Sequence, residues 1–220
     1  MLKLLVLAVL SFGCTSSNVQ FEKPLPPNGI NEKEIPGYLV GEYFSVSEKF
    51  NYLSSKKIEI KPTAIVLHEH FKQKIAKLDF DTIKNLSIVN NTVIELNGKD
   101  TVRYFFTMEN DTLTIPLDYE DTLFAFDRGD LLRKAGSFFY LNIKQADVWD
   151  VFRIKQTGND KITLYSPNNE NDIELLNKIT GITPADSVKK IYNLNKKQFK
   201  KFCRKGGFSV SDDFEKLKAD

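Results

Sequence analysis

Short β-rich runs separated by turn signals fill most of this chain, from Gly37 to Tyr165. Apolar and polar residues alternate along several of these runs with a period of two, which is typical of strands with one buried face. The runs lie at 38–46, 57–61, 64–71, 74–80, 83–89, 92–96, 102–108, 112–116, 122–126, 137–143, 147–155 and 161–165. Strands this short and closely spaced predict a mainly β fold, an antiparallel meander that forms a barrel (lipocalin-like or filled) or a sandwich.

Residues that favour turns separate the runs. Asn90-Asn91, Asn110-Asp111, Gly98 and Gly129 are expected at turns, because Asn, Asp and Gly tolerate the backbone angles that tight turns need. Gly158-Asn159-Asp160 predicts a hairpin. The strongest expected strand pair is 137–143 with 147–155, and it carries four large core candidates: Phe138, Tyr140, Trp149 and Phe152.

After Pro167 the spacing of apolar residues becomes helical, and two short C-terminal helices are predicted. The first is expected to be capped by Asn171, to end at Gly181, and to bury Ile173, Leu176 and Ile179. The second is expected to follow Asn195 over 196–205 and to end at Gly206, with an apolar stripe of Phe199, Phe202 and Cys203. We expect these helices to cover an end or an edge of the sheet.

The N-terminus has the features of a secretory leader. Lys3 supplies a positive charge, residues 4–10 are all apolar, and small residues precede Cys14. The sequence Ser-Phe-Gly-Cys resembles the lipobox of bacterial lipoproteins, with Phe as a departure from the usual pattern. That resemblance implies a signal peptide over 1–13, acylation (palmitate) of Cys14, and a cell-envelope protein bound to the membrane by its lipid.

The remaining chain is expected to have two parts. Residues 14–36 contain Pro24, Pro26, Pro27 and Pro36 and no regular period, so they predict a lipid-anchored tether. The alternative is an arm that packs on the domain through Phe21 and Leu25. Residues 37–220 are expected to form a single β-rich domain with a helical C-terminal part.

Composition narrows the class further. Without residues 1–13 the chain has 30 basic and 29 acidic residues, so no nucleic-acid partner is expected. With Cys14 acylated, Cys203 is the only free thiol and no internal disulfide can form. Stability must therefore come from an apolar core. The excess of Lys over Arg, with abundant Asn and Ile, resembles small lipoproteins of Bacteroidota. The segment after Cys14 lacks the acidic run of their surface-export signal, which favours the periplasmic side of the outer membrane.

Three clusters of ionisable residues are candidate functional sites. His68 and His70 share one face of a strand, but no third ligand can be placed from sequence, so no metal and no cofactor are expected. Residues 109–130 hold seven acids against one base, which predicts a solvated rim rather than calcium or a carboxylate pair. Residues 189–205 hold eight bases and no acid, and helical spacing gathers a candidate contact for anionic surfaces: Lys197, Lys200, Lys201 and Arg204.

Asp followed by Thr or Ser and an aliphatic residue recurs five times in the sequence. This pattern resembles the O-glycosylation sequon of exported Bacteroidota proteins, although Asx-turn chemistry produces the same pattern. The hydroxyls concerned are those of Thr82, Thr101, Thr112, Thr122 and Ser187.

No nucleophile elbow, zinc-protease helix, phosphate loop or dinucleotide fingerprint occurs in the sequence, so we expect a protein that is not an enzyme. The favoured hypothesis is an envelope lipoprotein that binds or scaffolds another protein at the membrane. A lipocalin-like carrier of a small apolar ligand and a carbohydrate-acting hydrolase using acids of 109–130 are the alternatives.

Overall fold

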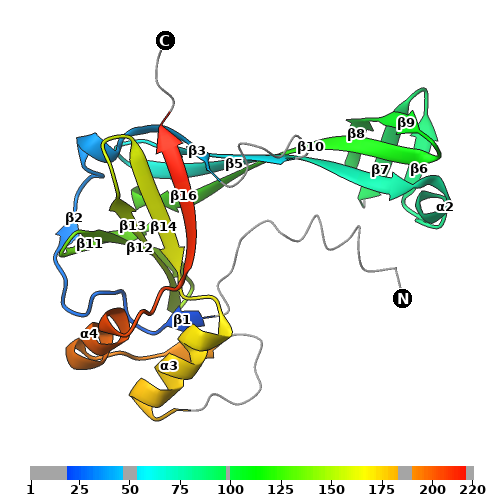
Figure 1. Ribbon diagram of the computed structural model, residues 1–220. Helices are drawn as coiled ribbons and strands as arrows, with labels where there is room; N and C mark the ends of the chain where they lie inside the picture. The colour runs from blue at the N-terminus through cyan, green and yellow to red at the C-terminus, as the bar shows by residue number, and fades with distance from the viewer. Residues whose placement is uncertain (1–18, 47–53, 98–99, 183–189, 217–220) are drawn as a thin grey trace.

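The computed structural model describes residues 19–46, 54–97, 100–182 and 190–216. It consists of a body, a two-stranded ribbon that leaves the body, and a small lobe at the far end of the ribbon (Figure 1). The fold is mainly β, with antiparallel sheets and short helices, which confirms the predicted class. Two short 3-10 turns, Gly37–Leu39 and Phe126–Arg128, complete the described elements.

One sheet runs through the whole body and continues into the ribbon. Its strand order is β2–β11–β12–β13–β14–β16–β3–β4–β5–β10–β9. The bounds are β2 (Asn31–Glu32), β3 (Gly41–Ser45), β4 (Ser54–Ile60), β5 (Ala64–Ala76), β9 (Thr107–Glu109), β10 (Thr112–Ala125), β11 (Leu131–Ala135), β12 (Phe138–Gln145), β13 (Val148–Gln156), β14 (Lys161–Ser166) and β16 (Val210–Lys216). The sheet folds over itself without closing, so the body is sandwich-like rather than a barrel.

Two apolar cores share strands β12 and β13. On β12, Phe139 and Leu141 face the core inside the folded sheet, while Tyr140 faces a second core on the outer side. On β13 the same alternation places Phe152 in the inner core and Val151 in the outer one. Because successive side chains of a strand point to opposite faces, a strand covered on both faces is apolar throughout.

The outer core is covered by the C-terminal helices α3 (Glu170–Thr180) and α4 (Lys196–Arg204), at one end of the body (Figure 1). Helix α4 follows its predicted cap, Asn195, and Gly181 ends α3 in the left-handed conformation as expected. The predicted cap of α3 is wrong by two residues. Asn169, not Asn171, accepts a hydrogen bond from the Asp172 backbone N–H at 2.8 Å.

The N-terminal arm packs on the body from Val19 onward. Strand β1 (Val19–Phe21) lies between β13 and β15 (Lys190–Tyr192), antiparallel to the first and parallel to the second. Val19, Phe21 and Leu25 are fully buried in the outer core. Residues 19–36 therefore do not form the free tether that was expected over 14–36. Burying their apolar side chains gains more free energy than the conformational entropy of a free linker would contribute.

Two strand breaks that the sequence predicted do not occur in the ribbon. The runs 64–71 and 74–80 form one strand, β5, followed by helix α2 (Lys77–Phe80), and the runs 112–116 and 122–126 form β10. Both strands continue because they pair along their whole length, with one register shift between Thr122 and Phe124. At Pro116, β10 pairs with β5 along one edge, whereas its pairing with β9 along the other edge ends at Thr114. A proline, which has no N–H to donate, is tolerated at such an edge position.

The lobe closes around the far end of the ribbon. A separate three-stranded sheet, β6 (Leu86–Val89), β7 (Thr92–Asn97) and β8 (Asp100–Phe105), packs against β10. Its core is small, with Phe80, Val93, Leu113 and Ile115 buried. The expected turns Asn90-Asn91 and Asn110-Asp111 both have positive φ at each residue, as tight hairpins need.

Candidate functional site

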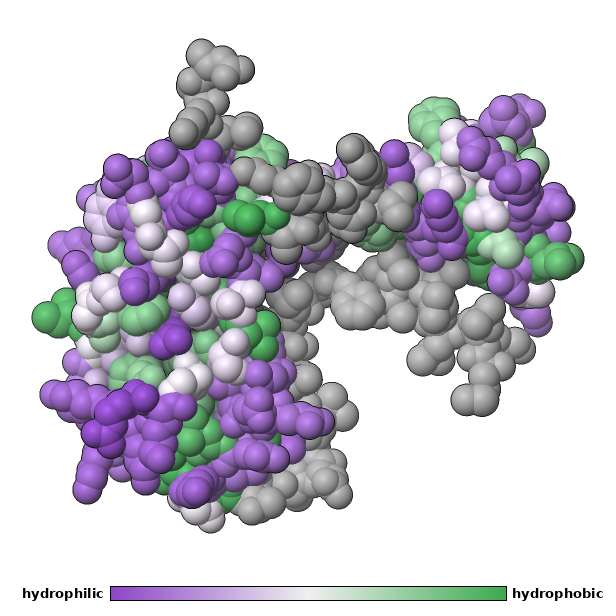
Figure 2. Space-filling view, viewed as in Figure 1, coloured by the Kyte–Doolittle hydropathy of each residue, from purple (hydrophilic) through white to green (hydrophobic). Residues whose placement is uncertain are grey.

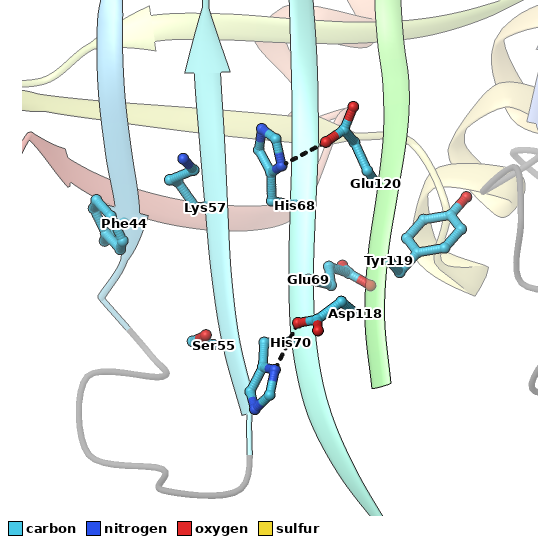
Figure 3. Close-up of a pocket in the computed structure, with 9 residues that line it drawn as sticks. All are labelled: Phe44, Ser55, Lys57, His68, Glu69, His70, Asp118, Tyr119 and Glu120. Atoms are coloured by element: carbon cyan, nitrogen blue, oxygen red, sulfur yellow. Dashed lines mark hydrogen bonds and ion pairs between the residues drawn. The ribbon is translucent and has the colours of Figure 1, made fainter. Parts of the chain in front are cut away.

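A cluster of histidines and carboxylates lies where the ribbon leaves the body (Figure 3). We call it the histidine–carboxylate cluster, and its members are Glu59, His68, His70, Asp118 and Glu120. Nδ1 of His70 lies 2.7 Å from Oδ1 of Asp118, and Nδ1 of His68 lies 3.2 Å from Oε2 of Glu120. The two histidines, Asp118 and Glu120 border a surface hollow of about 370 Å³, together with Lys57, Ser55 and Phe44.

Strand register brings the cluster together. His68 of β5 pairs with Glu120 of β10, and His70 of β5 pairs with Asp118 of β10. The two histidines are two residues apart along β5, and the two acids are two residues apart along β10. Side chains at a spacing of two share one face of a sheet, so both pairs face the same way. Sequence reasoning recognised the histidines and the acids separately but could not align them, because the pairing depends on β5 and β10 being continuous.

The cluster supports hydrogen bonding between histidine and carboxylate side chains more clearly than catalysis or metal binding. Glu59 also approaches Nε2 of His68, at 3.6 Å, which is too long for a hydrogen bond. A hydrogen bond from Lys61 holds the pKa of Glu59 below its ordinary value. Within the described parts of the chain, no group of three or more His, Cys, Asp or Glu side chains is arranged to hold a metal ion.

The acidic segment 109–130 divides into separate environments. Asp118 and Glu120 belong to the histidine–carboxylate cluster, and both are mostly exposed. Asp130 is buried and accepts hydrogen bonds from the backbone N–H groups of Ala125, at 2.8 Å, and Lys144, at 2.9 Å. Asp130 is thus a structural residue in the turn that ends β10, and it does not lie on a solvated rim.

The basic helix face predicted from sequence forms on α4. Phe199 and Phe202 are buried on one side of the helix, while Lys197, Lys200, Lys201 and Arg204 are exposed. The helix starts with a capping box in which the Asn195 side chain accepts from the backbone N–H groups of Lys197 and Gln198. Figure 2 shows this end of the body covered largely by hydrophilic residues.

The candidate glycosylation sites differ in exposure. Thr82 and Thr101 are exposed on the lobe, whereas Thr112 and Thr122 are partly buried. The Thr82 hydroxyl donates a hydrogen bond to the backbone oxygen of Asp79, at 2.7 Å. Ser187 and Cys14 lie outside the described residues.

The lobe exposes an apolar sheet face that sequence reasoning missed. Val93 and Glu95 of β7 point into the lobe and are buried, so Ile94 and Leu96 point outward. Strand pairing extends this outward row to its neighbours, and we call its apolar members the lobe outer face: Val89, Ile94, Leu96 and Phe105. Ser87, Thr92, Thr101 and Arg103 lie on the same side of the sheet among them. Phe105 is 80% exposed and Leu96 is 57% exposed. Figure 2 shows apolar residues on the lobe surface.

The sequence did contain a signal for this face. Runs 83–89, 92–96 and 102–108 carry apolar residues at both odd and even positions, which is typical of strands buried on both faces. In this small lobe, one of the two sides has no cover among the described residues.

Cys203 lies in the outer core, as its place on the apolar stripe of α4 predicts. Its Sγ is 3.6 Å from the Tyr140 hydroxyl, and burial raises the pKa of both groups. The guanidinium of Arg153 lies over the rings of Phe138 and Tyr165, at 4.4 and 4.6 Å from their centroids. This arrangement favours packing rather than a reactive thiolate.

Comparison with protein-family models, with curated proteins and with solved structures finds no match to this chain. Within the described residues, no helix has the length and apolar content that crossing a bilayer requires.

Proposed function

We propose that this protein is a lipoprotein of the bacterial cell envelope, anchored through Cys14 to the outer membrane on its periplasmic side, which acts as a binding or scaffolding module. The observation that carries the binding role is the lobe outer face. A sheet face on which Phe105, Leu96 and Val89 lie exposed near one another is typical of an interaction surface. The ribbon holds this face away from the body (Figure 1).

The position of the arm agrees with an anchor at Cys14. Only four residues separate Cys14 from Val19, the first residue of β1. The five residue steps from Cys14 to Val19 span at most about 18 Å whatever their conformation. An acylated Cys14 would therefore hold the helical end of the body close to the membrane, with the lobe projecting from it.

The two alternative functions have less support. A carrier of an apolar ligand needs an apolar cavity, and the inner core is instead filled by side chains such as Phe124, Leu141 and Phe214, all fully buried. A glycoside hydrolase needs two carboxyl groups facing each other across a cleft. The acids of 109–130 that the structure brings near the hollow, Asp118 and Glu120, are each paired with a histidine instead.

The binding role is tested by photo-crosslinking in the native host. A photoreactive residue placed at Phe105 or Leu96 should give the same discrete protein adduct. Ile30 is the matched control, because it is an equally exposed apolar residue on the body. No adduct from the lobe positions, or an identical pattern from Ile30, would contradict a binding surface on the lobe.

The anchor is tested separately. Cys14→Ser should leave the protein unprocessed or release it from washed membranes, because the acyl chains provide most of the membrane affinity. Mature Cys14→Ser protein that remains on membranes after high-salt washing would contradict acylation at this residue as the anchor.

A further inference from the structure

Helix α4 presents a rigid array of positive charge. Its five cations and the lysine that follows its last residue are all exposed: Lys196, Lys197, Lys200, Lys201, Arg204 and Lys205. Four of them, which we call the α4 basic face, span about 100° of the helix at 100° per residue: Lys197, Lys200, Lys201 and Arg204. The buried rings of Phe199 and Phe202 fix the opposite side of the helix to the outer core, so the basic face is held in one orientation.

These cations have no partners within the protein as far as it is described. No Asp or Glu oxygen of the described residues lies within 4.0 Å of any of the six, although ion pairs of that length form elsewhere, for example Lys161 with Glu215. The whole mature chain is almost neutral, so the charge is concentrated here rather than spread. Exposed like charges repel one another, and an anionic surface relieves that repulsion.

The basic face lies at the end of the body where the N-terminal arm begins. Helix α4, helix α3 and strand β1 gather at that end, opposite the end of β16 (Figure 1). Lys190 of β15 is in register with Val19, so another lysine lies beside the point from which the chain leads back to Cys14. Charge and the lipid attachment residue are thus brought to the same end of the molecule.

We propose that the α4 basic face docks on the anionic lipid headgroups of the membrane that holds the acyl chains of Cys14. This proposal rests on the proposed function and adds a second contact that orients the body. A lipid anchor with a basic patch is a stronger membrane contact than either alone, because the anchor keeps the patch at a high local concentration of headgroups. Docking there sets the ribbon and the lobe at a distance from the bilayer surface, because the ribbon leaves the body near the opposite end (Figure 1).

A lipid surface fits the array better than a single bound anion. The four cations lie on a convex helix with their side chains extended into solvent, and none is nine-tenths buried as in a built anion pocket. Such an array complements many headgroup charges spread over a surface.

The test separates docking from anchoring by using the mature chain with Cys14→Ser. We expect this protein to sediment with vesicles of phosphatidylcholine mixed with phosphatidylglycerol, and not with phosphatidylcholine alone. Binding should weaken strongly from 0.1 to 1 M salt, since the Debye length falls from about 10 to about 3 Å. The triple variant Lys197→Gln, Lys200→Gln, Lys201→Gln should lose about fivefold in partitioning per lysine, or roughly 100-fold in all.

The matched control is Lys72→Gln, Lys74→Gln, Lys84→Gln, which removes three exposed lysines from the ribbon and lobe. It should bind like the parent, and circular dichroism should show both variants folded. Equal loss in the two triples, or equal binding to neutral vesicles, would overturn docking through α4. If Cys14 proves acylated while the α4 triple binds normally, anchoring stands and docking fails. If Cys14 is not acylated but the α4 triple alone loses binding, docking stands without the anchor.

Discussion

Buried polar side chains fix segments outside the helices and strands of this protein by hydrogen bonding to their backbone groups. Asn142 is fully buried; its side chain accepts from the Leu25 N–H and donates to the Leu25 oxygen, at 2.8 Å for the latter. Asp172, also buried, accepts from the backbone N–H and the hydroxyl of Ser209. The Asn142 contacts satisfy backbone groups of Leu25 that are buried, so their loss costs more than the hydrogen bonds themselves.

Asn142→Leu should therefore destabilise the protein by about 2–4 kcal/mol, because the N–H and C=O of Leu25 are left buried without partners. Chemical denaturation measures the change, and hydrogen exchange should show faster exchange in residues 19–26. Asn159→Ala, at an exposed hairpin position, is the control and should change stability by less than about 0.5 kcal/mol. Equal effects of the two substitutions would mean that Asn142 does not hold the arm.

Cys203 should react slowly with thiol reagents in the folded protein. Burial raises the pKa of its thiol, so little thiolate is present at pH 8 and reagents have poor access. Because the folded state favours the protonated thiol, its contribution to stability is present below the unfolded pKa and is lost as pH rises through the folded value. A Cys14→Ser chain has this thiol alone, and its modification rate with Ellman's reagent should rise sharply on unfolding. Fast reaction in the folded state would instead indicate an activated cysteine.

O-glycosylation is expected at two or more of the five Asp-Thr/Ser hydroxyls in the native host. Exposure favours Thr82 and Thr101 over the partly buried Thr112 and Thr122, since a solvated glycan needs an accessible oxygen. Intact mass should exceed polypeptide plus acyl chains, and Thr82→Val with Thr101→Val should remove most of the excess. A mass explained by polypeptide and acyl chains alone refutes this prediction.

At the scale of elements, α4 is a short helix that depends on its ends and on one buried face. Nine residues are too few for a stable isolated helix in water, so the cap and the packing of Phe199 and Phe202 are both needed. The capping box has two parts: Asn195 binds the first-turn N–H groups, and the Gln198 side chain accepts from the Asn195 N–H at 3.0 Å. This element also positions the α4 basic face.

Asn195→Ala should accordingly destabilise the protein by about 1 kcal/mol, the usual cost of losing an N-cap. Lys196→Ala, at an exposed first-turn position, is the matched control and should be nearly neutral. Thermal or urea denaturation gives both values. If the proposed docking holds, Asn195→Ala should also weaken vesicle binding, although it removes no charge. An N-cap variant as stable as the parent would show that packing alone holds α4.

At the scale of the whole molecule, the body and the lobe have separate apolar cores. The lobe core has four buried residues, Phe80, Val93, Leu113 and Ile115, and is joined to the body by the paired strands β5 and β10. Beyond Phe71, no described residue of β4 pairs with β5, so the described part of the ribbon there consists of β5 and β10. A two-stranded ribbon couples two cores weakly, and local opening in the lobe is expected to precede global unfolding.

Leu113→Ala should lower the stability of the lobe by about 2–5 kcal/mol and leave the body intact, whereas Leu141→Ala should lower the stability of the body by a similar amount. Both leucines are fully buried, so the two substitutions are matched in chemistry. Hydrogen exchange with peptide resolution distinguishes the cores. If Leu113→Ala raises exchange in β12 and β13 as much as in β6–β8, the protein unfolds as one unit.

The local features of this protein could be predicted from its sequence. Period-two alternation gave the mainly β class, the positive-φ asparagines marked the hairpins at Asn90-Asn91 and Asn110-Asp111, and Asn195 with Phe199 and Phe202 defined α4. These features depend on neighbouring residues, whose conformational preferences are present in any window of the chain. The leader resemblance and the recurrent Asp-Thr/Ser pattern are also local features, and what they imply stays a prediction.

Which distant segments meet depends on the tertiary fold. The runs read from the sequence end at Phe71 and Pro116, but full-length pairing of β5 with β10 keeps both strands continuous. That pairing separates the lobe from the body and aligns His68 and His70 with Glu120 and Asp118. Packing likewise turned the expected tether into strand β1. Register and burial are set by partners far along the chain, and the free energy that selects those partners belongs to the assembled core rather than to any local sequence.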